Sequence, residues 1–154
     1  MIIGFTNGCF DLFHRGHDHY LRECKKACNY LIVALNSDAY CREVKGPDRP
    51  VWNWRRRMLF VKTLCNAVIP FEGRWEKLVL EIRPDVIFQG EEYRPADGKD
   101  VVMAARRKGW KELGHGFDVM PIIYIPRYGN WSTSNEILAA GLQNALEGVK
   151  TAPP

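Results

Sequence analysis

Two histidines flank one glycine near the N-terminus, where residues 7–17 read Asn-Gly-Cys-Phe-Asp-Leu-Phe-His-Arg-Gly-His. Imidazole N–H groups can donate hydrogen bonds to phosphate oxygens and stabilise the charge that builds up at phosphorus during transfer. Gly16 lets a ligand approach the backbone, and the start of the following helix offers N–H groups to an anion. The residue types and their spacing therefore indicate a phosphate site.

A second candidate anion site lies near the other end of the chain. The residues concerned are Ser132, Thr133 and Ser134. Thr133 and Glu136 fit a capping box, so we expect a helix to begin here and to continue through residues 137–146. A helix N-terminus with hydroxyl side chains and a nearby arginine, here Arg127, is an anion site in its own right. The sequence therefore predicts that the first loop and the last helix converge on one polyanion.

Short apolar runs alternate with amphipathic segments along the chain. We expect strands at residues 2–6, 30–35, 67–71, 86–89 and 119–125. We expect helices at residues 17–28, 54–65, 75–82, 100–108 and 137–146, and loops at residues 44–50 and 110–117. This order predicts an α/β fold, a Rossmann-like open parallel sheet with helices on both faces. Ligands of such sheets bind at the carboxyl ends of the strands, and the polar clusters lie there.

The length and composition indicate a globular protein. We expect one domain over residues 1–150 and a frayed tail at residues 151–154, since 46% of the 154 residues are hydrophobic and 26% are charged. The longest apolar runs, residues 31–35 and 119–125, are far shorter than the roughly 20 residues that a membrane span requires. Residues 1–11 show no secretory signal, so we expect a cytoplasmic protein that does not bind membranes.

The cysteines and the charge balance exclude little else. Five cysteines is an odd number, and all of them lie in the first 65 residues, so we expect free thiols rather than a disulfide framework. A formal charge of +4 could suit nucleic acid but is modest and by itself decides nothing. We do not expect nucleic acid as a partner. The arginines at 55–57 would equally suit a triphosphate or a solvated helix face.

The first loop resembles the Gly-x-Phe-Asp-x-x-His-x-Gly-His signature of the cytidylyltransferase-like nucleotidyltransferases. The matching residues are Gly8, Phe10, Asp11, His14, Gly16 and His17. Segments 36–38, 45–50, 57–58, 83–86 and 90–93 resemble the members that make ADP-heptose from heptose 1-phosphate. Segments 126–127 and 131–134 resemble the Arg-Thr-Glu-Gly-Ile-Ser-Thr signature of glycerol-3-phosphate and choline-phosphate cytidylyltransferases. The resemblance covers nearly the whole chain.

The resemblance implies roles for individual residues. The implied catalytic residues, which bind the triphosphate, are His14, His17, Lys45 and Arg127. The implied nucleotide-binding residues are Gly8, Cys9, Phe10, Gly16, Arg57, Gly90, Glu92, Ser132, Thr133 and Ser134. Asp11 and Asp38 either order the first loop or bind Mg²⁺ and substrate hydroxyls. We expect Mg²⁺ to arrive with the nucleotide, no metal site held by the protein alone, and a homodimer.

Less specific interpretations remain open for some of these residues. With His19, the two histidines could instead bind zinc, although their loop context favours phosphate. Lys45 could be a solvated lysine, but its basic Gly/Pro loop favours a phosphate role. Cys24 and Cys28 lie one helical turn apart and are expected to be buried structural thiols.

The function implied is transfer of a nucleoside monophosphate from a nucleoside triphosphate to a phosphorylated sugar or polyol, with release of pyrophosphate. We expect ATP and D-glycero-D-manno-heptose 1-phosphate as substrates. The alternatives are CTP with glycerol 3-phosphate or another phospho-alcohol, and a nucleotide-binding module without turnover. The family's glycine-aspartate turn after the fourth strand is Gly90-Glu91-Glu92 here, which leaves the choice of base open.

Overall fold

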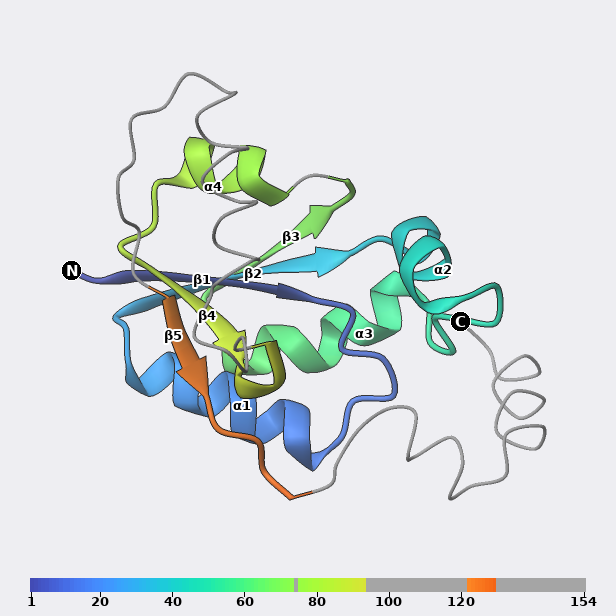
Figure 1. Ribbon diagram of the computed structural model, residues 1–154, viewed down its shortest axis with the longest axis horizontal. Coiled ribbons are helices and arrows are strands. Elements are labelled where there is room, and N and C mark those ends of the chain that lie inside the picture. Colours follow the sequence, from blue (N-terminus) through green and yellow to red (C-terminus); the bar gives the residue numbers. More distant parts are fainter. Residues whose placement is uncertain (74, 94–121, 130–154) are drawn as a thin grey trace.

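The computed structural model describes residues 1–73, 75–93 and 122–129 (Figure 1). The strands are β1 (Ile3–Gly8), β2 (Tyr30–Asn36), β3 (Ala67–Phe71), β4 (Val86–Gly90) and β5 (Ile122–Ile125). The helices are α1 (Arg15–Lys26), α2 (Asp38–Lys45), α3 (Trp54–Val61) and α4 (Trp75–Ile82), with short 3₁₀ helices at Lys62–Leu64 and Glu91–Tyr93. The elements predicted at residues 100–108, 110–117 and 137–146, and the tail at 151–154, lie outside the described residues.

All five described strands are parallel, in the order β3-β2-β1-β4-β5. The predicted open parallel sheet is confirmed. β1 lies in the middle, and its last residue, Gly8, is in register with Leu35 of β2. Because every strand runs the same way, the loop after β1 lies beside the ends of β2 and β4.

Helices cover both faces of the sheet, as predicted. Alternate residues of β2 divide between the two faces: Leu31, Val33 and Leu35 pack with α1 and α3, whereas Ala34 packs with Val79 of α4. Figure 1 shows α1 and α3 on one side of the strands and α4 on the other. A strand that is buried on both faces needs apolar residues at every position, which explains the continuous apolar run of β2.

Helix α2 is the one α-helix of the described residues that the sequence did not predict. It has eight residues, of which only Cys41 is buried, so no apolar period marks it. Its start is fixed by Ser37, whose hydroxyl accepts a hydrogen bond from Tyr40 N at 3.0 Å. It ends at Lys45, and the capping residue that follows, Gly46, has a φ of 113°, which favours glycine. The loop predicted over residues 44–50 therefore begins two residues later than expected.

Among the described residues, no helix combines the length and the apolar content that a membrane span needs.

Candidate active site

The loop between β1 and α1 has an unusual backbone. Phe10 and Leu12 have φ values of 49° and 47°, in the left-handed region that residues with side chains rarely adopt. The Phe10 ring folds back over Gly8, so that a Cβ at Gly8 would lie 2.9 Å from it. Such conformations cost about 1–3 kcal/mol each and persist only where surrounding contacts hold them.

The Asp11 carboxylate provides the first of these contacts and is only 2% exposed. Its Oδ2 accepts a hydrogen bond from Val51 N at 2.7 Å and pairs with Arg49 Nε at 3.2 Å. Its Oδ1 accepts from Trp52 N at 2.9 Å and from Leu12 N at 3.0 Å. These contacts link the first loop to residues 49–52, the segment before α3, so Asp11 orders the first loop. Its binding of Mg²⁺ or substrate hydroxyls stays a prediction.

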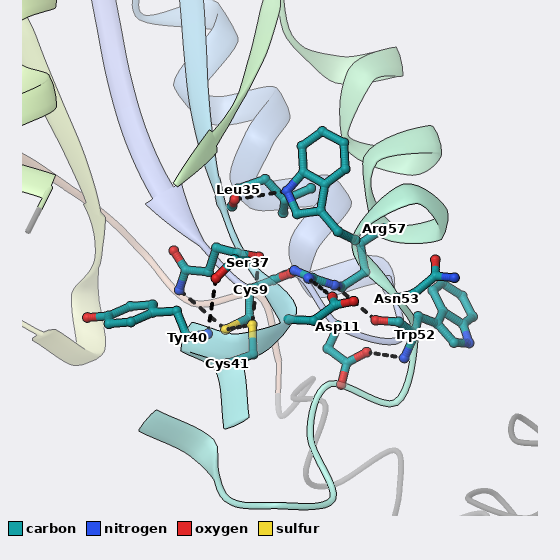
Figure 2. A network of polar contacts seen from close by, with 12 residues as sticks. Cys9, Asp11, Leu35, Ser37, Tyr40, Cys41, Trp52, Asn53 and Arg57 are labelled. Atoms are coloured by element: carbon teal, nitrogen blue, oxygen red, sulfur yellow. Dashed lines mark hydrogen bonds and ion pairs between the residues drawn. The ribbon is translucent and has the colours of Figure 1, made fainter. Parts of the chain in front are cut away.

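Arg57 provides the second set of contacts and has no exposed surface. Its Nε donates to Trp52 O at 3.0 Å, Nη1 to Cys9 O at 2.7 Å and Nη2 to Asp38 Oδ1 at 2.7 Å (Figure 2). One guanidinium thus joins the first loop, the segment before α3 and the start of α2. The solvated interpretation of residues 55–57 is wrong for Arg57, because its position on α3 faces the loop. Ligand binding by Arg57 and Asp38 stays a prediction.

His14 caps α1 with its own ring. Nδ1 accepts hydrogen bonds from Gly16 N at 3.1 Å and His17 N at 3.3 Å. The prediction that the helix start offers its N–H groups to an anion is therefore wrong for these two groups, because the ring already binds them. Since Nδ1 is an acceptor, a neutral His14 carries its proton on Nε2. The proton that His14 can give to a phosphate oxygen is the one on Nε2.

His17 lies in an aromatic enclosure. Its ring stacks on His14 with centroids 3.7 Å apart, and Phe10 and Phe13 lie at 5.3 and 5.4 Å. Burial, and after it the charge of His14, lowers the pKa of His17 to about 3. Its Nδ1 is buried and has no hydrogen-bond partner among the residues that the structure describes. His17 is therefore neutral at pH 7, with a polar atom that a ligand could satisfy.

The predicted phosphate-binding cations Lys45 and Arg127 are both exposed. Lys45 is the last residue of α2, and its charge helps to lower the pKa of Cys9 in the first loop. Arg127 follows β5, and its neighbour Tyr128 stacks on His19 of α1 with centroids 4.8 Å apart. This stack brings the segment after β5 against α1. Both cations thus lie on segments next to the first loop and its helix.

The predicted helix start that carries the second anion site lies outside the described residues. Its residues are Ser132, Thr133 and Ser134. The convergence of that site with the first loop stays a prediction. The stacking of Tyr128 on His19 supports one part of this prediction, namely that the segment after β5 lies against α1.

The turn after β4 carries the two predicted nucleotide-binding residues Gly90 and Glu92. The Glu92 carboxylate lies back over the glycine, so that a Cβ at Gly90 would lie 2.5 Å from Glu92 Oε2. Gly90 is in register with Ile125, the last residue of β5. The turn therefore lies at the edge of the sheet where ligands bind, and its contact with nucleotide stays a prediction.

Two side-chain contacts at this edge were not predicted from the sequence. Gln89 Nε2 donates to Asn7 Oδ1 at 3.4 Å, joining the ends of β4 and β1. The available sequence signal was Gln89 itself, a polar residue at the end of the apolar run 86–88. Cys41 Sγ lies 2.8 Å from Cys9 Sγ, and no sequence signal connects two cysteines that are 32 residues apart.

The zinc interpretation of the histidines finds no support in the geometry. Within residues 1–73, 75–93 and 122–129, no group of three His, Cys, Asp or Glu side chains could hold a metal ion. His19 stacks on Tyr128, whereas His14 and His17 stack on one another.

Comparison with known proteins assigns the chain to a family and relates it to curated proteins. A family model described as cytidylyltransferase-like matches residues 5–135. The bifunctional protein HldE of Chromohalobacter salexigens is 44% identical over 105 residues, which are 65% of this chain and 22% of that protein. The bifunctional protein HldE of Edwardsiella ictaluri is 39% identical over 130 residues, 80% of this chain and 27% of that protein. The chain thus spans about a quarter of the length of these relatives.

Solved structures share the fold. The lipopolysaccharide core biosynthesis protein from Thermoplasma volcanium GSS1 superposes with a TM-score of 0.66 and 27% identity, over 83% of this chain and 98% of that one. The pantoate-beta-alanine ligase from Francisella tularensis, solved with beta-gamma ATP and beta-alanine, has a TM-score of 0.60. At 15% identity, over 97% of this chain and 70% of the ligase, the second likeness shows the fold alone.

Proposed function

Because this chain belongs to the cytidylyltransferase-like family and is a nucleotidyltransferase, we propose that it transfers AMP from ATP to D-glycero-D-manno-heptose 1-phosphate. The products are ADP-heptose and pyrophosphate. The observation that carries this choice is the 39–44% identity to the HldE proteins. The resemblance of segments 36–38, 45–50 and 90–93 to the ADP-heptose-forming members supports it.

The reaction is an in-line displacement, in which an oxygen of the acceptor phosphate attacks the α-phosphorus and pyrophosphate leaves on the opposite side. The acceptor phosphate is already an anion at neutral pH, so no general base is needed and positioning supplies most of the rate. His14 donates from Nε2, and neutral His17 donates from its ring, to oxygens whose charge grows in the transition state. Lys45 and Arg127 add positive charge, and Mg²⁺ bound to the nucleotide supplies further neutralisation.

The decisive experiment measures pyrophosphate release with each of the four common nucleoside triphosphates and a panel of phosphorylated sugars and polyols. We expect the highest kcat/KM with ATP and heptose 1-phosphate. A preference for CTP and glycerol 3-phosphate would select the second candidate, which the signature-like segments 126–127 and 131–134 favour. Nucleotide binding without pyrophosphate from any pair would reject both.

The role of the histidines is tested by His17→Ala. We expect kcat to fall about 10²–10³-fold, the cost of removing one donor to a developing oxyanion, with circular dichroism unchanged. Arg22→Ala is the matched control, since Arg22 belongs to the same helix, is exposed and pairs with Asp18 on the solvent side. Equal losses in both variants would mean that α1 packing, and not phosphate contact, explains the effect.

A further inference from the structure

Two cysteines from separate elements meet beside the first loop. Cys9 follows β1, Cys41 lies in α2, and their Sγ atoms are 2.8 Å apart (Figure 2). Cys9 is partly exposed, whereas Cys41 is 1% exposed. A disulfide has a sulfur–sulfur distance of about 2.05 Å, so less than roughly 1 Å of movement would close the pair.

The surroundings of the Cys9 sulfur are those of a thiolate. The sulfur accepts hydrogen bonds from Cys41 Sγ at 2.8 Å and from Asn36 Nδ2 at 3.3 Å. These bonds, with the charges of Arg57 and Lys45, lower the pKa of Cys9 to about 6 although burial opposes the shift. The neighbouring Cys9 raises the pKa of Cys41 well above its usual value. At neutral pH the pair is therefore one nucleophilic thiolate and one thiol that donates to it.

The other three cysteines have the opposite environment. Cys28 Sγ donates to Cys24 O at 3.3 Å and Cys65 Sγ to Val61 O at 3.3 Å. Burial raises the pKa of Cys24 and Cys28, and raises that of Cys65 to about 11. These thiols stay protonated at neutral pH and provide internal controls for reactivity.

We propose that Cys9 and Cys41 form a peroxide-oxidisable pair that closes to an intramolecular disulfide at the edge of the nucleotide site. The Cys9 thiolate attacks one oxygen of hydrogen peroxide, and the O–O bond breaks to give a sulfenic acid and hydroxide. The Cys41 sulfur then attacks the Cys9 sulfur and displaces its hydroxide, which takes up the Cys41 proton and leaves as water. In total, one thiolate, one thiol and one peroxide give one disulfide, one water and one hydroxide.

The disulfide has a consequence for the site that rests on the proposed function. Cys41 and Lys45 are four residues apart on α2, one helical turn. A bond from Cys41 to the first loop fixes the direction of α2 and hence the reach of Lys45 toward the triphosphate. We expect oxidation to lower the rate of pyrophosphate release at least several-fold, and a dithiol reductant to restore it.

The formation of the disulfide can be tested without an activity assay. The full chain is treated with hydrogen peroxide and digested without reduction, and the cross-linked peptides are identified by mass. We expect a Cys9–Cys41 cross-link with a loss of about 2 Da from the intact chain, reversed by dithiothreitol. Cys41→Ser should give no cross-link and a Cys9 sulfenic acid that dimedone traps, whereas Cys65→Ser should behave as the unaltered chain.

A cross-link to any other cysteine, or sulfinic acid at Cys9 with Cys41 still reduced, would overturn the proposal. Measuring pyrophosphate release separates the effect of the disulfide on turnover from the proposed function itself. A cross-linked chain that releases pyrophosphate as fast as the reduced chain would overturn the effect on Lys45. Absence of turnover in the reduced chain would reject the proposed function and leave the mapped disulfide unaffected.

Discussion

The charged residues around the first loop form two sets that differ in how far they are buried. Asp11 and Arg57, 2% and 0% exposed, direct their polar atoms to backbone groups and to each other's segments. Lys45 and Arg127 are exposed on neighbouring segments. The same family resemblance singled out all four residues. The comparison teaches that the charged residues which one family resemblance singles out divide between those that hold the loop and those whose side chains are exposed.

The strongest test of this division is Arg57→Ala. The variant leaves Asp38 without its partner and the carbonyls of Cys9 and Trp52 without a donor, so we expect the free energy of unfolding to fall by about 3–5 kcal/mol. Arg57→Lys should recover little, because an ammonium group lacks the planar fork that reaches three acceptors. Urea denaturation measures both. Arg55→Ala, on an exposed position of the same helix, should change stability by less than about 0.5 kcal/mol.

Asp11→Ala should have the next largest effect. It leaves the N–H groups of Val51 and Trp52 without acceptors, at a cost of about 1–3 kcal/mol for each buried group left unsatisfied. Asp11→Asn keeps one acceptor oxygen and should lose less. Denaturation with the same protocol gives both values. If Asp11→Ala lost activity at unchanged stability, the carboxylate would contact ligand, as we propose for Lys45 and Arg127, rather than hold the loop.

The low pKa of His17 predicts that the stability of the protein depends on pH. Its folded pKa of about 3 lies below its ordinary value of 6.5, so the unfolded chain takes up a proton before the folded chain does. The resulting stability is fully present above pH 6.5 and is lost as the pH falls toward 3. Between pH 7 and pH 5 we expect a loss of about 1–2 kcal/mol that His17→Gln does not show. Parallel slopes in the two proteins would mean that His17 is not the titrating group.

Lys45→Ala should have the smallest effect on stability and a clear effect on activity. We expect the free energy of unfolding to stay within about 0.5 kcal/mol. We expect kcat/KM to fall about 10- to 100-fold, since a hydrogen bond to a charged group contributes roughly 1.5–3 kcal/mol. Lys62→Ala, at another exposed lysine, is the control. If Lys45→Ala were destabilised but fully active, Lys45 would hold the loop, as Asp11 and Arg57 do, rather than bind the triphosphate.

Much of the described fold could be predicted from the sequence. The strand Ala67–Phe71 and the helix Trp75–Ile82 have the bounds that their local patterns predict. Helix Asp38–Lys45 could not be predicted, because it buries one side chain and its start depends on a single capping hydroxyl. Local patterns predict an element only when several of its residues share a buried face.

The candidate site was predicted less completely. The motif located the loop and its histidines, but it gave no sign that the His14 ring caps α1 or that Cys9 meets Cys41. The first is a choice of rotamer, and the second joins residues 32 apart. Neither depends on local periodicity, so no sequence pattern could reveal them.

The sequence by itself determined the alternation of buried strands and amphipathic helices, and hence a parallel sheet with its polar loops along one edge. Only the tertiary structure decided which polar atoms along that edge are already bound. Arg57 shows the reason, since its guanidinium contacts a carbonyl 48 residues away that α3 reaches only when packed on the sheet. Residue type sets what a side chain can bind, and packing sets which partners lie within hydrogen-bond distance.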